Sequence, residues 1–269
     1  GLGRSLRRLS LAALLLWPLI LPQQAAALTA GEVSEVVDGD TIVVAGHNVR
    51  LLGINTPEKA RGGTPAEPGA QKATEKLKSL LSKPDGTFHQ VKLAYDSNKT
   101  DRYDRLLAHV YLPDGTWVNK ALVEAGVAHV YSFPDNRQHL GKLLHAEKQA
   151  RKAGKNLWQH PDMQIMAAEN LTSDNAPQGK IGQYRLVKGT PIKAAKVNKR
   201  IYLNYGKNWR TDFTVEIPQK FWPNFYNAGL DPLTYYTNKT VVARGRLKPV
   251  NGVLITATHP AQLQVLEGH

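Results

Sequence analysis

Two aspartates separated by a glycine stand at the centre of the stretch EVVDGDTIVV, residues 35–44. Asp-Gly between two apolar runs is a strong hairpin signal, so the stretch predicts a turn that faces solvent. In an extended chain, however, residues two apart point to the same side, and this applies to Asp38 and Asp40. Like charges held side by side repel each other unless a cation lies between them. The stretch therefore indicates either a simple turn or half of a metal site.

Further oxygen ligands follow in the segment RLLGINTPE, which begins at Arg50 and ends at Glu58. Pro57 fixes its own φ and biases Thr56 towards an extended conformation, so the chain bends there and holds Glu58 near the end of a strand. The Asn55 side chain and the Thr56 carbonyl offer neutral oxygens, and the carboxylates add charge. Hard cations such as Ca²⁺ prefer mixed oxygen shells of this kind. The segment therefore offers ligands that suit a hard cation, and the alternative is a simple loop corner.

A third polar cluster, DRYDR, occupies residues 101–105 and holds two arginines and a tyrosine beside a predicted turn. Arginine does not lose its proton in proteins, and it binds phosphate oxygens through a planar fork of donors. Each of the three clusters alone fits a bland alternative: a turn, a loop corner or a solvated charge at a strand end. Their order along one chain favours a common site over three unrelated loops.

The elements that must position these residues are predicted from hydrophobic periodicity. Apolar residues alternate around turns over 33–54, and their helical spacing over 66–81 predicts a surface helix. After it we predict strands at 91–95 and 106–112 and helices at 117–128 and 136–158. Strands and helices do not alternate as βαβ units, which argues against a doubly wound parallel sheet.

The last third of the chain follows a different pattern. Residues 167–180, AAENLTSDNAPQGK, are polar and aperiodic and contain Pro and Gly, so they predict a linker. Five short strands are predicted after the linker, at 191–197, 201–205, 211–217, 241–247 and 254–258. Their number and order favour a small closed β-barrel of the oligonucleotide/oligosaccharide-binding (OB) type.

Charge is divided unevenly along the chain. The net charge of the 269 residues is +13, which favours an anionic partner such as nucleic acid, a membrane surface or an acidic substrate. Residues 28–179 contain 18 basic and 18 acidic residues, whereas residues 180–269 contain 14 basic and 4 acidic ones, a net charge of +10. The sequence has no cysteine, which excludes disulfides and thiolate metal sites.

Basic and aromatic residues interleave in NKRIYLNYGKNWR, residues 198–210. Proteins that bind single-stranded nucleic acid combine a basic groove with aromatic stacking platforms. The alternative is a hairpin whose aromatic side chains belong to the core and whose basic edge is solvated.

Residues 1–27 have the pattern of a secretory signal peptide. Three arginines precede an apolar run at 9–21, which is too short to span a bilayer comfortably, and three alanines suited to cleavage follow. An uncleaved membrane anchor is the alternative. No second apolar run is long enough for a transmembrane helix, so we expect a periplasmic or secreted protein without stable membrane insertion.

Four motifs together resemble the staphylococcal nuclease (thermonuclease) family: DGDT, RLLGINTPE, DRYDRLLAHVY and WVNKALVEAGVAHV. The resemblance runs from about residue 33 to residue 158 and covers the full family domain. It implies a five-stranded OB-type barrel that carries three helices. It also implies calcium-dependent hydrolysis of phosphodiester bonds in DNA and RNA, with little sequence preference. A weaker resemblance links the last third to an OB-type domain that follows the nuclease in some bacterial members.

The resemblance implies a set of metal ligands. Asp40 corresponds to the carboxylate that binds calcium directly, and Thr56 to the ligand that uses its backbone oxygen. Asn55 stands where the best-known member has an aspartate, and its lower charge should weaken calcium binding. Asp38 corresponds to an acidic residue that acts near the metal at most through water. The expected cofactor is therefore Ca²⁺, with Asp40, Asn55 and Thr56 as ligands.

The same resemblance implies three catalytic residues. Glu58 corresponds to the proposed general base, which orients or deprotonates the attacking water, and Arg50 and Arg105 correspond to the arginines that grip the phosphate. Asp104 stands where the family usually has glycine. Aspartate tolerates a left-handed turn conformation better than most residues, so the fold should persist. Its charge could pair with a neighbouring arginine and weaken that arginine's phosphate contact.

The sequence therefore predicts an exported, monomeric, calcium-dependent nuclease that acts on DNA, RNA or both. The expected fold is α+β and mainly β, with a staphylococcal-nuclease-like domain at 28–166, a linker at 167–180 and a basic OB-like nucleic-acid-binding domain at 181–269. Two alternatives remain: a nuclease-like module that binds nucleic acid without cutting it, and an envelope protein that binds anionic polymers. Arg50, Glu58 and Arg105 favour the enzyme, because a binding module has no need to keep them together.

Overall fold

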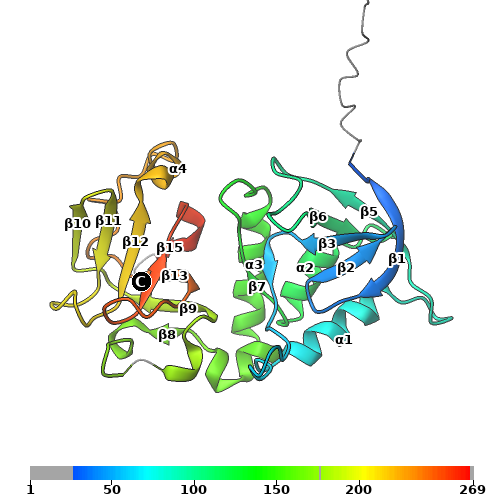
Figure 1. Cartoon of the computed structure of the whole chain (residues 1–269), viewed down its shortest axis with the longest axis horizontal. Helices are drawn as coiled ribbons and strands as arrows, with labels where there is room; N and C mark the ends of the chain where they lie inside the picture. Colours follow the sequence, from blue (N-terminus) through cyan, green and yellow to red (C-terminus); the bar gives the residue numbers. More distant parts are fainter. Residues whose placement is uncertain (1–26, 176, 267–269) are drawn as a thin grey trace, which may run out of the picture.

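The computed structural model describes residues 27–175 and 177–266. The predicted signal peptide, apart from its last residue, lies outside the described residues. None of the helices in the described ranges has the length and apolar character needed to cross a bilayer. Two units lie side by side in Figure 1, a barrel with three helices and a second, mainly β unit.

The first unit is a closed barrel of five strands in the order β1-β2-β3-β6-β5. The strands are β1 (Ala30–Val36), β2 (Thr41–Val44), β3 (His47–Leu51), β5 (Gln90–Ala94) and β6 (Leu106–Tyr111). β3 and β6 pair in parallel, and the other neighbours are antiparallel. Exposed and buried residues alternate along β5, as expected when one face of a strand lines a core. The barrel predicted for this part of the chain is confirmed.

Three helices pack on the barrel: α1 (Ala70–Leu81), α2 (Val118–Glu124) and α3 (Leu140–Lys152). The buried residues of α1 include Ala73 and Leu77, which share one stripe of the helix and belong to the barrel core. A small sheet of β4 (Ile54–Asn55) and β7 (His129–Val130) lies beside them. The three predicted helices are therefore present, although each is shorter than expected.

Glycines in the left-handed region explain why α1 begins later and α3 ends earlier than predicted. Gly69, with φ of 92°, precedes the first residue of α1, and Gly154, with φ of 62°, follows α3. Glycine adopts this conformation without steric cost, and it commonly ends helices. The predicted helix over 136–158 therefore stops near residue 152, and a separate 3₁₀ turn follows at Asn156–Gln159.

The second unit contains two four-stranded sheets, with the orders β15-β13-β9-β8 and β10-β11-β12-β14. Their strands are β8 (Met166–Ala167), β9 (Tyr184–Gly189), β10 (Lys193–Val197), β11 (Arg200–Asn204), β12 (Thr214–Pro218), β13 (Val241–Arg246), β14 (Leu254–Thr256) and β15 (Leu263–Val265). Side chains from both sheets, among them Val187, Leu203 and Val241, share one core with the short helix α4 (Trp222–Tyr226). Short 3₁₀ turns lie at Pro161–Met163, Ala168–Asn170, Gln178–Lys180, Gln219–Phe221 and Pro260–Gln262.

All five strands predicted for this unit are present, but β8, β9 and β15 were not predicted from the sequence. β9 is buried at four successive residues and carries Arg185 in that run, so neither alternation nor a clean apolar run marks it. The predicted linker at 167–180 also contributes Ala168 and Leu171 to the core of the second unit. The second unit is therefore two packed sheets, and its OB-like character stays a prediction.

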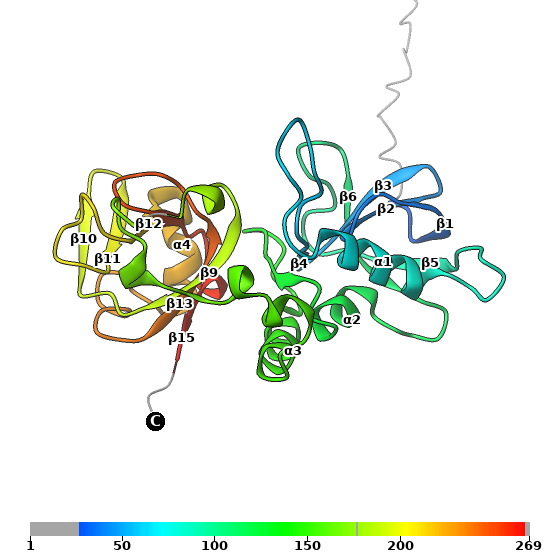
Figure 2. The ribbon, with the colours of Figure 1, turned by 90° about the horizontal axis from the view of Figure 1, so that it is seen from below.

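A buried ion pair joins the two units. Arg244 of β13 donates from both terminal nitrogens to the carboxylate of Glu147 on α3, each at 2.9 Å, and both side chains are 1% exposed. Arg244 and the Tyr184 hydroxyl also donate to the carbonyl of Val130, at 3.0 and 2.9 Å. Burial alone would raise the pKa of Glu147, but the charge of Arg244 and the hydrogen bonds that the carboxylate accepts from Arg244 and from the Val130 N–H hold it below its usual range. Both views place α3 between the barrel and the second unit (Figures 1 and 2).

Candidate active site

The turn between β1 and β2 presents Asp40 to the interior of the site. Asp40 is 7% exposed, and its Oδ2 accepts hydrogen bonds from the backbone N–H of Thr56 at 2.9 Å and its hydroxyl at 3.0 Å. A Cβ on Gly39 would lie 2.6 Å from the Cβ of Ala73 and 2.7 Å from the Thr56 hydroxyl oxygen. Only glycine therefore allows the turn to approach α1 and Thr56 this closely.

Arg50 links the turn to the segment after β3. It is 6% exposed, and its Nη2 lies 3.3 Å from Oδ2 of Asp40 and donates to Oδ1 of Asn55 at 3.4 Å. Its Nη1 donates to the carbonyl of Leu51 at 2.7 Å, which fixes the guanidinium plane. The structure therefore brings four predicted site residues together in one buried cluster, Asp40, Arg50, Asn55 and Thr56.

Asp38 adds a second carboxylate beside this cluster. Its Oδ1 accepts a hydrogen bond from the backbone N–H of Asp40 at 3.0 Å. Burial, together with the negative charge of Asp40, raises the pKa of Asp38 to about 6. A neighbouring cation would stabilise the ionised form of Asp38, which burial and Asp40 disfavour.

The donors at this site fit a hard cation. Within the described part of the chain, no group of three or more His, Cys, Asp or Glu side chains is arranged to hold a metal ion. A cation beside Asp40 would therefore complete its shell with the Asn55 amide, the Thr56 carbonyl and water, which are ligands that calcium accepts.

Arg105 is held in place by Asp101 rather than by Asp104. Its Nε donates to Oδ2 of Asp101 at 2.8 Å, and the other oxygen of Asp101 accepts backbone N–H groups of Tyr103 and Arg105 at 2.9 and 3.1 Å. Burial would raise the pKa of Asp101, but these hydrogen bonds lower it. Asp104 adopts φ of 60°, so it occupies the left-handed turn position that the sequence predicted for it.

Glu58 lies outside the buried cluster. Its side chain is 59% exposed, and its backbone N–H donates to Oε2 of Glu67 at 2.9 Å. Across the described residues, neither a hydrogen bond nor an ion pair connects Glu58 or Arg105 to Asp40, Asn55 or Thr56. Four of the predicted site residues therefore form one buried cluster. Glu58 and Arg105 lie apart from it and are more exposed.

Arg246 is a residue near the site that sequence reasoning missed. It ends β13 in the second unit, and its Nη2 lies 3.8 Å from Oε1 of Glu58. Its Nη1 donates to the carbonyl of Gly182 at 3.1 Å. Arg246 is 188 positions after Glu58 (246 − 58 = 188), and no motif surrounds it, so only folding reveals this proximity.

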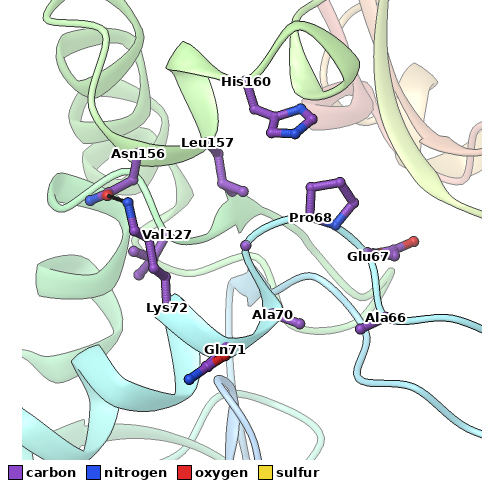
Figure 3. Close-up of a pocket in the computed structure, with 11 residues that line it drawn as sticks. Ala66, Glu67, Pro68, Ala70, Gln71, Lys72, Val127, Asn156, Leu157 and His160 are labelled. Atoms are coloured by element: carbon purple, nitrogen blue, oxygen red, sulfur yellow. Dashed lines mark hydrogen bonds between the residues drawn. The ribbon is translucent and has the colours of Figure 1, made fainter.

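A cavity of about 380 Å³ lies at the start of α1, and Figure 3 shows the side chains that line it. Leu157 and Val127 contribute apolar surface there, and Glu67 lies at its edge. None of the predicted ligands or catalytic residues lines this cavity. It is therefore a neighbour of the site and not the site itself.

The first unit is thus a closed five-stranded barrel that buries Arg50 among carboxylate and amide oxygens. Residues 48–160 match the family model described as staphylococcal nuclease homologue. The chain is 35% identical over 131 residues to a thermonuclease of Staphylococcus hyicus, an alignment that covers 47% of this chain and 74% of the relative. The identity to a thermonuclease of Staphylococcus intermedius is 34% over 131 residues, with the same coverage. This chain belongs to the staphylococcal nuclease family.

A third relative is similar over a smaller share of its length. It is the SPbeta prophage-derived endonuclease YokF of Bacillus subtilis, 31% identical over 128 residues, which cover 45% of this chain and 41% of the relative. The family match ends at residue 160, so the second unit lies outside it.

Proposed function

We propose that this protein is an exported, calcium-dependent nuclease that hydrolyses phosphodiester bonds of DNA, RNA or both with little sequence specificity. The observation that carries the proposal is the buried cluster of Arg50 with Asp40, Asn55 and Thr56 in a member of the staphylococcal nuclease family. A buried arginine beside carbonyl and carboxylate oxygens has donors to spare for an anionic substrate. Relatives with the printed names thermonuclease and endonuclease support the same activity.

Asp40, Asn55 and Thr56 are the residues that would hold Ca²⁺. Bound there, the ion would neutralise charge that develops on the phosphate oxygens. Asp38, whose carboxylate contacts the backbone of Asp40, would add to the negative potential that attracts the cation.

Three side chains would act on the substrate. Arg50 and Arg105 would donate to the phosphate oxygens, which carry more negative charge in the transition state than in the ground state. Asp101 accepts a hydrogen bond from Nε of Arg105 and so restricts the orientation of the guanidinium. Glu58 would take a proton from the attacking water, and its exposure leaves room for that water at the rim of the barrel.

The domain roles follow from charge. We propose that 28–166 form the cutting domain and that 181–269, joined to it through 167–180, form the basic domain that binds nucleic acid. Residues 180–269 carry a net charge of +10, whereas residues 28–179 are neutral overall.

Export is proposed from the signal-peptide pattern of residues 1–27, and the protein is proposed to act as a monomer.

Binding without cutting is the second candidate function. Asn55 lowers the ligand charge of the metal site, and Arg246 lies within 3.8 Å of the proposed base Glu58. Both features would suit a module that holds nucleic acid without hydrolysing it. An envelope protein that binds anionic polymers ranks third, because it leaves the buried cluster without a purpose.

The test is incubation of the purified protein with plasmid DNA and with RNA, in calcium and in excess chelator. We expect cleavage in calcium and none in chelator. Glu58→Gln is the control variant, because it keeps the size of an exposed side chain and removes its basicity. Cleavage that continues in chelator would contradict the calcium assignment. Binding without cleavage under any condition would favour the second candidate.

A further inference from the structure

The outer face of the sheet β10-β11-β12-β14 carries a groove that has no role in the active site. Along β11, Ile201 and Leu203 are fully buried in the core, whereas Tyr202 and Asn204 are half-buried. Successive side chains of a strand point to opposite faces, so Tyr202 and Asn204 lie on the outer face. Asn204 pairs in register with Lys193 of β10 and with Thr214 of β12.

Two loops deepen this face into a cavity of about 440 Å³. One loop follows β11 and contributes Lys207 and Trp209, and the other precedes β14 and contributes Asn251. The side chain of Trp209 is 49% exposed although it is the largest apolar group in the lining. The guanidinium of Arg210 lies 4.5 Å from its ring centroid and helps to hold the indole in place.

The charged residues that line the groove are basic. Lys193 and Lys207 are among the eleven lining residues, and none of the eleven is acidic. Glu216, which pairs in register with Tyr202 on the same face, forms an ion pair with Arg200 at 3.2 Å. The surrounding segment, residues 180–269, carries a net charge of +10. The groove therefore combines the exposed indole of Trp209 and the half-buried ring of Tyr202 with positive charge and an amide group.

We propose that this groove binds single-stranded nucleic acid. Trp209 and Tyr202 stack on unpaired bases, and Lys193 and Lys207 contact the adjoining phosphates. Aromatic platforms in a basic groove suit single strands, because bases of a duplex are stacked on each other and expose no free face. Asn204, which is half-buried, supplies hydrogen-bonding groups for base edges. The ligand class rests on the proposed function, whereas the site rests on its own geometry.

The groove lies far from the catalytic cluster. Figures 1 and 2 both place β10 and β11 at the end of the second unit that faces away from the barrel. A strand bound there cannot place its bound phosphates at Arg50 or Glu58. The groove therefore retains long substrates and leaves the chemical step on short ones unaffected.

The experiment measures fluorescence anisotropy of a labelled oligothymidylate with the full chain in excess chelator, so that binding does not depend on cleavage. Trp209→Ala should weaken binding about 5- to 150-fold, which corresponds to the roughly 1–3 kcal/mol expected for one stacked base. Trp209→Phe should recover most of the affinity, because it keeps an aromatic face. Tyr226→Ala is the matched control, since Tyr226 is 48% exposed but does not line the groove.

Three further results complete the test. Lys193→Ala with Lys207→Ala should lower the slope of log affinity against log salt by about 0.7 for each lost phosphate contact. Equal affinities for the Trp209→Ala and Tyr226→Ala proteins, with unchanged unfolding temperatures, would overturn the proposal. The proposal would also be overturned if the Trp209→Ala protein lost binding to phosphatidylglycerol vesicles but kept binding to the oligonucleotide. If the protein binds the oligonucleotide but never cleaves nucleic acid, the nuclease proposal fails and the groove proposal stands.

Discussion

The two units of this protein place charge in opposite ways. Residues 28–179, which include the barrel and also β8, have equal numbers of basic and acidic residues, and the barrel buries Arg50 and Asp40 in a hydrogen-bonded cluster. Residues 180–269, which include most of the second unit, carry a net charge of +10, and they expose lysines and Trp209 around an open groove. A buried and oriented charge interacts strongly but only with groups close to it. Exposed positive charge attracts a polyanion from a distance, and this attraction is screened by salt. The difference points to a division of labour between cutting and holding.

The ion pair between the units should give the largest effect on stability. Arg244→Met leaves Glu147 buried without its partner, and breaking a buried pair in this way costs about 3–5 kcal/mol. Chemical denaturation of the full chain measures the loss. Adding Glu147→Leu to Arg244→Met should recover much of the stability, because neither member of the pair then remains as a buried charge without its partner. If the Arg244→Met protein were as stable as the parent, the pair would not hold the units together.

Removal of one proposed catalytic group should give the next largest effect. Glu58→Gln and Arg105→Ala should each lower the turnover rate about 10²- to 10³-fold, in line with the loss of one transition-state donor. Both side chains are partly exposed, so the unfolding temperature should change little. Steady-state kinetics in saturating calcium check the rate. Near-normal turnover of Glu58→Gln would remove Glu58 from the mechanism.

Acid should destabilise the protein through its buried histidines. Burial lowers the pKa of His109 in the barrel and of His259 in the second unit to about 4. The unfolded chain binds a proton at each near pH 6.5, so the native state loses stability as pH falls from about 6.5 to about 4, up to roughly 3 kcal/mol for each histidine. Denaturation at pH 7 and at pH 4.5 measures the change.

The two histidines provide a comparison between the units. His259 contacts the hydroxyl of Ser132 in the first unit at 2.7 Å, whereas His109 accepts from Trp117 within the barrel at 3.2 Å. His109→Gln and His259→Gln should each flatten the pH dependence. A profile between pH 7 and 4.5 that stays the same in both variants would show that other groups cause it.

A smaller effect is expected at the metal site. Asn55→Asp adds a negative charge beside Asp40 and Arg50 and should tighten calcium binding by about 1 kcal/mol, roughly fivefold. Its turnover need not rise, since the added charge also repels the substrate. Calorimetric titration with calcium measures the affinity. Weaker binding in the variant would mean that Asn55 is not a ligand or that the site is shaped for the amide.

Arg246 should give the smallest effect. Its contact with Glu58 at 3.8 Å joins two side chains that are about half exposed, and such pairs contribute little to stability. Arg246→Ala should change kcat/KM by less than about fivefold and leave the unfolding temperature unchanged. Arg246→Lys, which keeps the charge, is the matched control. A loss comparable to that of Glu58→Gln would place Arg246 in the catalytic machinery and blur the division between the units.

Much of the barrel, and the proximity of several candidate site residues, could be predicted from the sequence because the informative residues are close together. Asp38, Asp40, Asn55 and Thr56 fall within one short segment, and the hairpin of β2 and β3 brings its two ends together. The strands of the second unit were only partly predicted, because β9 carries Arg185 inside a buried run. The partners of Glu58 and Glu147 could not be predicted. Arg246 and Arg244 reach them only after the two units have packed together.

The most direct test of the division of labour compares Glu58→Gln with Trp209→Ala on a long single strand and on a short oligonucleotide. We predict that Glu58→Gln lowers kcat on both substrates and leaves binding of the long strand in chelator unchanged. Trp209→Ala should weaken binding of the long strand and leave kcat on the short one unchanged. The account would be contradicted if both substitutions altered the same parameter on both substrates.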